Sequence, residues 1–177
     1  SLVTVNNGKL KFCSVGGQDY FIDPNQNILT KKSIPAILFE VDNTKPFTMS
    51  AKVIPTFTKE GLYNAADFLV FVNDTLTQKL CYEQDEYGGH RVVSVRTQGT
   101  SDDNNHDLIN EPYVYFKISS DTHTIASYYS RDGKAWHMVR LYKNYYPTKL
   151  YLGIASQCPK KGKNTCTFEN LKFSQNN

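Results

Sequence analysis

Closely spaced carboxylates in Glu83-Gln84-Asp85-Glu86 are the first candidates for chemistry. Residues two apart on a strand project from the same face, so Glu83 and Asp85 are expected to lie together. A retaining glycoside hydrolase needs such a pair, with carboxyls about 5–5.5 Å apart. The strand-borne motif of laminarinase-like glycosidases needs a second Glu where this chain has Tyr87 or Gly88. We therefore predict no glycosidase, although a carboxylate brought from a distant strand, such as the one carrying Asp67, would complete a pair with Glu83.

An oxygen-rich run, Ser101-Asp102-Asp103-Asn104-Asn105-His106-Asp107, is the second candidate. Calcium takes about six to eight oxygen ligands, which such a run could supply. The Gly and the terminal Glu of the common calcium loop are absent, and a surface loop whose Asx side chains bond their own backbone explains the run equally well. The Cys and His spacings of zinc sites are also absent. We expect no metal and no cofactor.

A polar strip across two consecutive strands is the third candidate. Alternation directs Leu80 and Tyr82 to the core, and we expect Val93 and Val95 of the next strand to point inward as well. The strip that remains on the opposite face consists of Lys79, Glu83, Ser94 and Arg96. Such a strip either stabilises the sheet through charge pairs worth about 0.2–1 kcal/mol each or lines a binding face.

The only tryptophan, Trp136, follows the turn Asp132-Gly133. It is either a platform on which a sugar ring stacks or a buried anchor of the hairpin. The four His residues are scattered and pair with no Ser or Cys nucleophile.

Short strands are expected to carry these candidate residues. Apolar or alternating runs are separated by turn residues, and Asp132-Gly133 between two such runs is the clearest hairpin signal. We also expect a turn over Ser101–Asn105, and the one helical candidate, Lys59–Ala66, is short. This pattern predicts an all-β fold, an antiparallel β-sandwich in a single domain. The expected strands are Lys9–Val15, Asp19–Asp23, Ala36–Val41, Phe47–Ile54, Asp67–Asn73, Gln78–Glu83, Arg91–Thr97, Tyr113–Ser119, Thr124–Ser130, Trp136–Tyr142, Leu150–Ser156 and Thr165–Phe173.

Length and charge restrict the classes of function. The 177 residues fit one domain, 1–177. Lys plus Arg number 20 and Asp plus Glu 17, and the net charge of +3 is far from the basic footprint of nucleic-acid-binding proteins. No stretch approaches the roughly 18 consecutive apolar residues of a membrane span. We expect neither nucleic acid nor a membrane as a partner.

The cysteines leave two alternatives open. Cys13 and Cys81 lie in strand-like runs, where a reduced Cys behaves as a small hydrophobe. Cys158 and Cys166 flank a loop rich in Lys and could either close a hairpin by a disulfide or stay reduced. The first residues, Ser1–Val5, lack the pattern of a signal peptide, and we expect a cytoplasmic location.

Several short motifs occur in a fixed order along the chain. They are Ala66-Asp67-Phe68-Leu69-Val70-Phe71, Lys79-Leu80-Cys81-Tyr82-Glu83, Val92-Val93-Ser94-Val95-Arg96-Thr97, Ser101-Asp102-Asp103, Tyr129-Ser130-Arg131-Asp132-Gly133-Lys134-Ala135-Trp136, Val139-Arg140 and Leu152-Gly153-Ile154-Ala155-Ser156. In this order they resemble the regulation-of-enolase protein family, a domain-of-unknown-function family with a concanavalin A-like jelly-roll fold. The resemblance runs from about Ala51 to Phe173, and the first fifty residues match only loosely.

The resemblance implies a function but no catalytic residue. The fungal namesake of the family is cytosolic and linked to enolase and sugar metabolism, and this chain looks closer to the fungal branch. We therefore expect a non-enzymatic regulator that binds a protein partner, enolase by resemblance alone. The alternative is a carbohydrate-binding module, and a glycoside hydrolase is the least favoured. The candidate binding surface consists of Lys79, Glu83, Ser94, Arg96, Asp102, Trp136 and Arg140.

Overall fold

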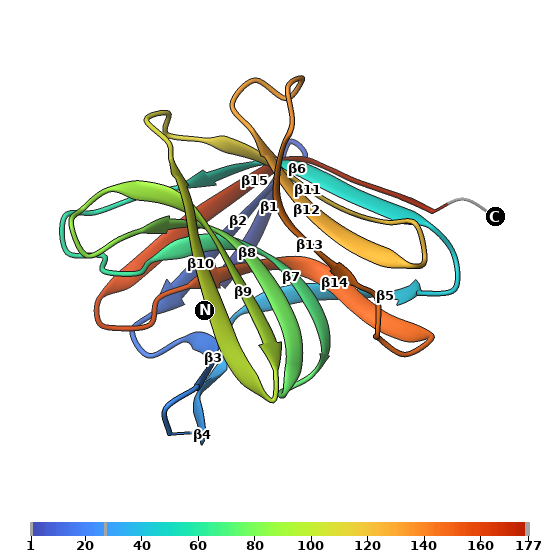
Figure 1. Cartoon of the computed structure of the whole chain (residues 1–177). Coiled ribbons are helices and arrows are strands. Elements are labelled where there is room, and N and C mark those ends of the chain that lie inside the picture. The colour runs from blue at the N-terminus through green and yellow to red at the C-terminus, as the bar shows by residue number, and fades with distance from the viewer. Residues whose placement is uncertain (1, 27, 176–177) are drawn as a thin grey trace.

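Fifteen strands, each paired antiparallel with its neighbours, make up the described part of the chain (Figure 1). The computed structural model describes residues 2–26 and 28–175. Within these ranges no helix is long and apolar enough to cross a membrane. The connections are turns and short loops, as expected where antiparallel strands follow one another along the chain.

Two large sheets form the sandwich, and a small third sheet lies beside them. The seven-stranded sheet has the order β1 (Leu2–Asn6), β2 (Lys9–Val15), β15 (Lys163–Gln175), β6 (Phe47–Pro55), β11 (Val114–Ser120), β12 (Thr124–Ser130) and β13 (His137–Lys143). The six-stranded sheet has the order β10 (Thr100–Leu108), β9 (His90–Gln98), β8 (Leu76–Gln84), β7 (Ala65–Asn73), β14 (Lys149–Gln157) and β5 (Ala36–Asp42). The two-stranded sheet pairs β3 (Asp19–Asp23) with β4 (Ile28–Ser33).

The main core fills the space between the two large sheets. Along β6, buried residues such as Phe47 and Met49 alternate with half-buried ones, as the period of two along a strand requires. Phe116 on the neighbouring β11 stacks edge-on against Phe68 of the opposite sheet, with ring centroids 5.7 Å apart. Both of these rings are fully buried. Burial of such rings is the main favourable contribution to folding.

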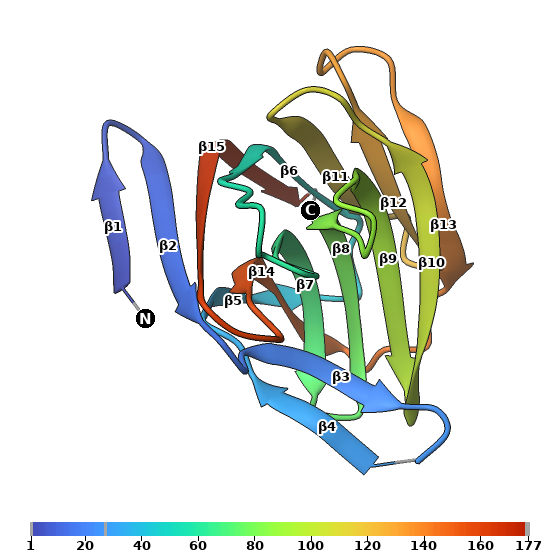
Figure 2. The ribbon, with the colours of Figure 1, turned by 90° about the vertical axis from the view of Figure 1, so that its left-hand side faces the viewer.

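The six-stranded sheet is covered on its second face as well. The hairpin of β3 and β4 lies across the ends of β7, β8, β9 and β10 (Figure 2). There Phe21 of β3 packs on a small apolar cluster made by Ala65, Cys81, Val93 and Val95. Because both faces are covered, β7 begins with six consecutive buried residues in place of an alternating pattern.

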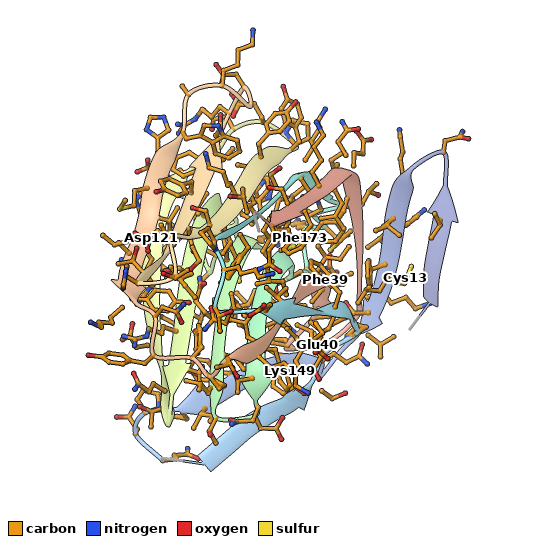
Figure 3. All side chains as sticks on the ribbon, turned by 90° about the vertical axis from the view of Figure 1, so that its right-hand side faces the viewer. Cys13, Phe39, Glu40, Asp121, Lys149 and Phe173 are labelled. Atoms are coloured by element: carbon orange, nitrogen blue, oxygen red, sulfur yellow. The ribbon has the colours of Figure 1, made fainter. Side chains whose placement is uncertain are left out.

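At the opposite edge of this sheet, β5 and the last part of β15 come together. Phe39 of β5 and Phe173 of β15 stack edge-on at 4.9 Å, and Glu40 pairs with Lys149 at 3.9 Å (Figure 3). A glycine is required at position 153 of β14, because a Cβ there would lie 1.9 Å from the carbonyl oxygen of Ile37 on the paired strand β5.

The predicted fold class is confirmed: the chain is an all-β antiparallel sandwich. The hairpin at Asp132-Gly133 is confirmed too, with Gly133 at φ 77° between β12 and β13. The turn predicted over Ser101–Asn105 is wrong, because these residues belong to β10. This edge strand pairs with β9, and most of its side chains face solvent, so no apolar alternation revealed it. The short strands β1 and β4 were not predicted either.

Candidate functional site

The second face of the six-stranded sheet brings together side chains that bear charge. We call it the outer face, the one that carries Cys81, Val93 and Val95 and points away from the main core. Asp67 of β7 is paired with Cys81, so it lies on this face. Lys79 and Glu83, two residues to either side of Cys81 on β8, lie there too.

Lys79 is the central cation of this face. Its Nζ donates to Asp19 Oδ1 at 2.6 Å and to Gln157 Oε1 at 2.8 Å. Lys79 is 2% exposed and Asp19 is 7% exposed, so this is a buried ion pair. Burial acts against the charged ammonium, but the negative charge of Asp19 outweighs it and holds the pKa of Lys79 above its ordinary value. Breaking such a pair from one side leaves an uncompensated buried charge.

Gln157, at the end of β14, links this ion pair to Glu83. Its Nε2 donates to Glu83 Oε2 at 3.1 Å and to the backbone oxygen of Tyr63 at 2.9 Å. Burial raises the pKa of Glu83 to about 8; the charge of Lys79 opposes this rise, and that of Asp67 adds to it. Glu83 is therefore largely protonated at neutral pH and can donate a hydrogen bond as well as accept one.

Asp67 lies beneath this network and is completely buried. Among the described residues, neither of its carboxylate oxygens has an N–H or O–H partner. Burial raises its pKa to about 7, against the opposing charge of Lys79. The sheet register pairs Asp67 with Cys81, so Asp67 lies diagonally from Glu83 on the outer face, where the enzymatic alternative required a second carboxyl. Burial raises the pKa of both carboxyls, so their environments do not separate an acid from a base.

A pocket of about 520 Å³ opens above these residues. This volume lies within the range of small-molecule sites, about 300–1,000 Å³. The floor includes Lys79, Glu83 and Gln157. The rings of Phe21 and Tyr63 contribute aromatic walls. Asp103, Asn105 and Lys160 add polar groups to the lining.

Tyr63 reaches the pocket from a strained backbone. Its φ of 62° is in the left-handed region, which costs a residue with a Cβ about 1–2 kcal/mol. The conformation is held by its N–H, which donates to the Gln84 carbonyl at 2.9 Å, and by its carbonyl, which accepts from Gln157. Strain of this kind is concentrated at functional sites.

Asp85 also borders the pocket, but its carboxylate is occupied. It accepts hydrogen bonds from Arg91 Nε at 3.0 Å, Gly89 N at 2.8 Å and Tyr87 N at 3.0 Å. Burial would raise its pKa, but these bonds hold it below the ordinary value. Asp85 therefore shapes the turn after β8. Within residues 2–26 and 28–175, no group of His, Cys, Asp and Glu side chains converges to hold a metal ion.

The predicted polar strip is wrong as a single surface, because its members lie on two faces. Lys79 and Glu83 are on the outer face. Ser94 pairs with Leu80 and Arg96 with Gln78, so these two point toward the space between the sheets. The reason is that Val93 and Val95 pack under Phe21 of β3, while Val92 enters the main core.

The other candidate residues join Ser94 and Arg96 away from the pocket. Arg140 of β13 donates from Nε to Ser94 Oγ at 2.8 Å and from Nη2 to Asp102 Oδ1 at 3.1 Å. The guanidinium of Arg96 lies over the Tyr142 ring at 4.8 Å. These contacts join the edges of the two large sheets and form a structural clamp.

Trp136 lies on the other side of the sandwich. It is half-buried, and Lys117 Nζ lies 4.2 Å from its ring centroid. Lys117 points outward from the seven-stranded sheet, between the buried Phe116 and Ile118. Trp136 is therefore neither a core anchor nor part of the pocket.

Several residues of the pocket were not predicted from the sequence, among them Asp19, Phe21, Tyr63 and Gln157. The strand Asp19–Asp23 was predicted, but nothing in its pattern shows that it crosses another sheet. Tyr63 precedes β7 in an irregular segment and Gln157 ends β14, so no periodicity identifies either one.

The comparisons with known proteins address the family and the fold. The sequence matches the family described as "Protein of unknown function (DUF1349)" over residues 2–176. This chain belongs to the DUF1349 family. The match also covers the first fifty residues, beyond the region in which the sequence motifs were found. No curated protein sequence matches the chain.

Solved structures with this fold include proteins of several kinds. A functionally unknown protein from Saccharomyces cerevisiae has a TM-score of 0.88 and 20% identity, covering 99% of this chain and 92% of that one. A xylan beta-1,4-xylosidase from Bacillus halodurans has a TM-score of 0.71 and 16% identity, covering 96% of this chain but 33% of that one. Lectin I-B4 from Griffonia simplicifolia, in its metal-free form, has a TM-score of 0.65 and 12% identity, covering 99% and 91%. These similarities establish a DUF1349 β-sandwich of the lectin-like, concanavalin A-like type.

Proposed function

We propose that this DUF1349 protein binds carbohydrate in the pocket on the outer face of its six-stranded sheet. The observation that carries the proposal is the combination of aromatic walls and a hydrogen-bonding floor in a pocket of about 520 Å³. Polar groups at a few fixed places in a partly apolar pocket are what a small ligand requires for orientation and specificity.

The chemistry of the lining suits sugar hydroxyls, each of which both donates and accepts hydrogen bonds. Glu83 in its protonated form and Asn105 can each do both. The rings of Tyr63 and Phe21 offer flat faces to the C–H groups of a sugar ring. Tyr63 is held in a strained backbone conformation at this place, which supports a role in binding.

The structural neighbours support the same proposal. One is named a lectin and another a xylan beta-1,4-xylosidase, and both names refer to carbohydrate. At identities of 12% and 16%, these neighbours are evidence for the fold alone. The proposal of carbohydrate binding therefore rests on the pocket residues of this chain.

Calorimetric titration with a panel of oligosaccharides tests the proposal. We expect saturable binding of at least one sugar with Kd of roughly micromolar to millimolar. Tyr63→Asn should weaken it about tenfold, since Asn tolerates the left-handed backbone and removes only the ring. Tyr145→Asn, at an exposed position after β13, is the matched control and should bind normally. Binding that is unchanged by Tyr63→Asn, or no binding to any sugar, contradicts the proposal.

A second candidate is the protein-binding regulator of enolase that the resemblance implies. The observation that favours it is β13, an edge strand of the seven-stranded sheet. Met138 and Leu141 on this strand are 48% and 54% exposed, which is suited to a protein interface. A cytoplasmic location belongs to this candidate, and four free thiols support it, because the cytosol keeps thiols reduced.

Titration of enolase into the protein, with a parallel assay of enolase activity, tests the second candidate. Saturable binding with a changed rate, lost in Leu141→Ser and kept in Tyr63→Asn, is the expected result. A flat titration would remove enolase as the partner and leave the pocket proposal untouched.

A further inference from the structure

Carboxyl side chains are concentrated in the pocket, out of proportion to the chain as a whole. Six carboxylate side chains line it, against two lysines, in a protein whose net charge is +3. Asp19 pairs with Lys79 and Asp85 with Arg91. Glu83, Glu86 and Asp103 form no ion pair among the described residues.

A second observation, independent of the lining, points the same way. Asp67 lies on the outer face near Lys79 and is 0% exposed; its carboxyl has no N–H or O–H partner among the described residues, only the neighbouring thiol of Cys81. Lys79 is thus the one ammonium shared by Asp19, Asp67 and Glu83 on this face. A carboxylate in such a low-dielectric place is costly until a positive charge approaches. Lys160, whose Nζ lies 5.9 Å from the Tyr63 ring centroid, is the other lysine of the lining, so the carboxyl groups of the pocket outnumber its lysines.

The geometry favours an organic cation over a metal ion. In the part of the chain that the structure describes, the carboxylates do not converge on a point where a metal could bind. The walls carry the rings of Phe21 and Tyr63, whose faces attract an ammonium group electrostatically. Carboxylates spaced around a pocket with aromatic walls suit a bulky ligand that carries one protonated nitrogen.

We infer that the pocket selects an amino sugar, with its protonated amine among the carboxylates of Glu83 and Asp103 and its ring against Tyr63. This inference rests on the proposed carbohydrate-binding function and specifies the class of sugar. The recognised feature is a primary ammonium on a pyranose ring, which a neutral or N-acetylated sugar lacks.

Proton release should accompany such binding. The groups that face Glu83 are Lys79 on its own strand, Asp67 on β7, Asp19 on β3 and Gln157 on β14. Arg91, the residue opposite Glu83 on β9, is paired with Asp85. With no ligand, burial keeps the pKa of Glu83 at about 8 and that of Asp67 at about 7. An incoming ammonium stabilises the ionised carboxyls, so binding at pH 6, where the sugar amine is protonated, expels protons from these carboxyls. Toward pH 8 the sugar amine itself loses its proton, so the preference for the amino sugar should fade.

Calorimetric titration of the full chain with three trisaccharides tests the inference. The probes are the β-1,4-linked trimer of glucosamine, its fully N-acetylated form, and cellotriose, which is neutral. We expect the glucosamine trimer to bind about tenfold tighter than either of the others. Repeating the titration at pH 6 in buffers of different ionisation enthalpy should show net proton release for the glucosamine trimer alone.

Charge-removing variants locate the effect. Glu83→Gln, and separately Asp103→Asn at the exposed rim, should each weaken the glucosamine trimer about tenfold and change cellotriose by less than about twofold. Glu40→Gln removes a carboxylate at the far edge of the same sheet and should change neither (Figure 3). Asp103→Asn keeps the test valid if the Glu83 variant does not fold.

The outcomes separate the two claims. If cellotriose or the N-acetylated trimer binds as tightly as the glucosamine trimer, the amine inference is overturned and the carbohydrate function stands. If no trisaccharide binds, both are overturned. If 1,6-diaminohexane binds as tightly as the glucosamine trimer, the pocket recognises amines without regard to sugar, which overturns the carbohydrate function.

Discussion

The carboxyl group of Asp67 illustrates how a single residue can set the chemistry of a sheet face. It is buried without an N–H or O–H partner among the described residues, and Lys79 is the cation that acts on it. Burial disfavours its charged form, so its pKa is raised to about 7. The folded protein therefore holds a proton on this carboxyl near neutral pH, while the unfolded chain releases it well below that.

The pH dependence of stability follows from this difference. A carboxyl whose pKa is higher in the folded state stabilises the fold fully below its unfolded pKa, near 4. That contribution is lost as the pH rises through about 7. Asp67→Asn has no such loss, so it should melt close to the wild type at pH 5 and higher by several degrees at pH 8–9, the equivalent of about 1–3 kcal/mol.

Thermal melts of both proteins from pH 5 to 9 measure this directly. Glu40→Asn, at an exposed position, is the control and should follow the wild type throughout. A melting difference between Asp67→Asn and the wild type that does not change with pH would show that Asp67 is not protonated in the folded state.

At the scale of elements, one hairpin converts a sheet face into a pocket. Strand β3 supplies Asp19 and Phe21 to the lining, and the N–H of its Ile22 donates to Ser101 Oγ of β10 at 2.9 Å. At the other edge, Arg140 of β13 bonds Ser94 and Asp102 and thereby joins the two large sheets. The hairpin belongs to the pocket, and the Arg140 clamp belongs to the framework.

This division predicts that the clamp can be removed without loss of binding. Arg140→Met leaves Ser94 without its donor, and we expect the free energy of unfolding to fall by about 1–2 kcal/mol with saccharide affinity unchanged. Lys143→Met, at an exposed position on the same strand, should change neither quantity. Chemical denaturation and calorimetric titration are the measurements. A loss of sugar affinity in Arg140→Met would show that the contacts of Arg140 belong to the binding site.

The same division explains what could be predicted from the sequence. Antiparallel strands and the hairpin at Asp132-Gly133 were predicted because alternation and turn residues act locally. The prediction of a single polar strip was wrong at Val92 and Val93. Both faces of β9 are covered, so the alternation of residues does not show which face points to the main core. Lys79 and Glu83 were found as candidate residues, whereas Asp19 and Tyr63 reach them through long-range packing that leaves no local pattern.

At the scale of the whole molecule, the two outer surfaces of the sandwich differ in chemistry. The pocket on the six-stranded sheet is rich in carboxylates. On the seven-stranded sheet, Lys52 lies 4.2 Å from the Tyr113 ring centroid and Lys117 lies 4.2 Å from that of Trp136.

The sandwich is held together without a disulfide among the four cysteines, all of which are free. Of the two alternatives left open for Cys158 and Cys166, the structure has the reduced one.

We expect the melting temperature to be the same with and without reductant. Burial raises the pKa of Cys166 to about 12, so its thiol should react slowly. Alkylation of the native protein should label the half-buried Cys13 first, and all four cysteines should be labelled only after unfolding. A melting temperature that changes when reductant is added would contradict the absence of a disulfide.

An NMR titration of the labelled protein with the glucosamine trimer, followed through its backbone amides, would locate the binding site. We expect the shifted amides to cluster around the pocket, at Tyr63, Glu83, Asn105 and Gln157. Shifts that cluster around Trp136 and Lys117 on the seven-stranded sheet, or no shifts at millimolar trimer, would contradict it.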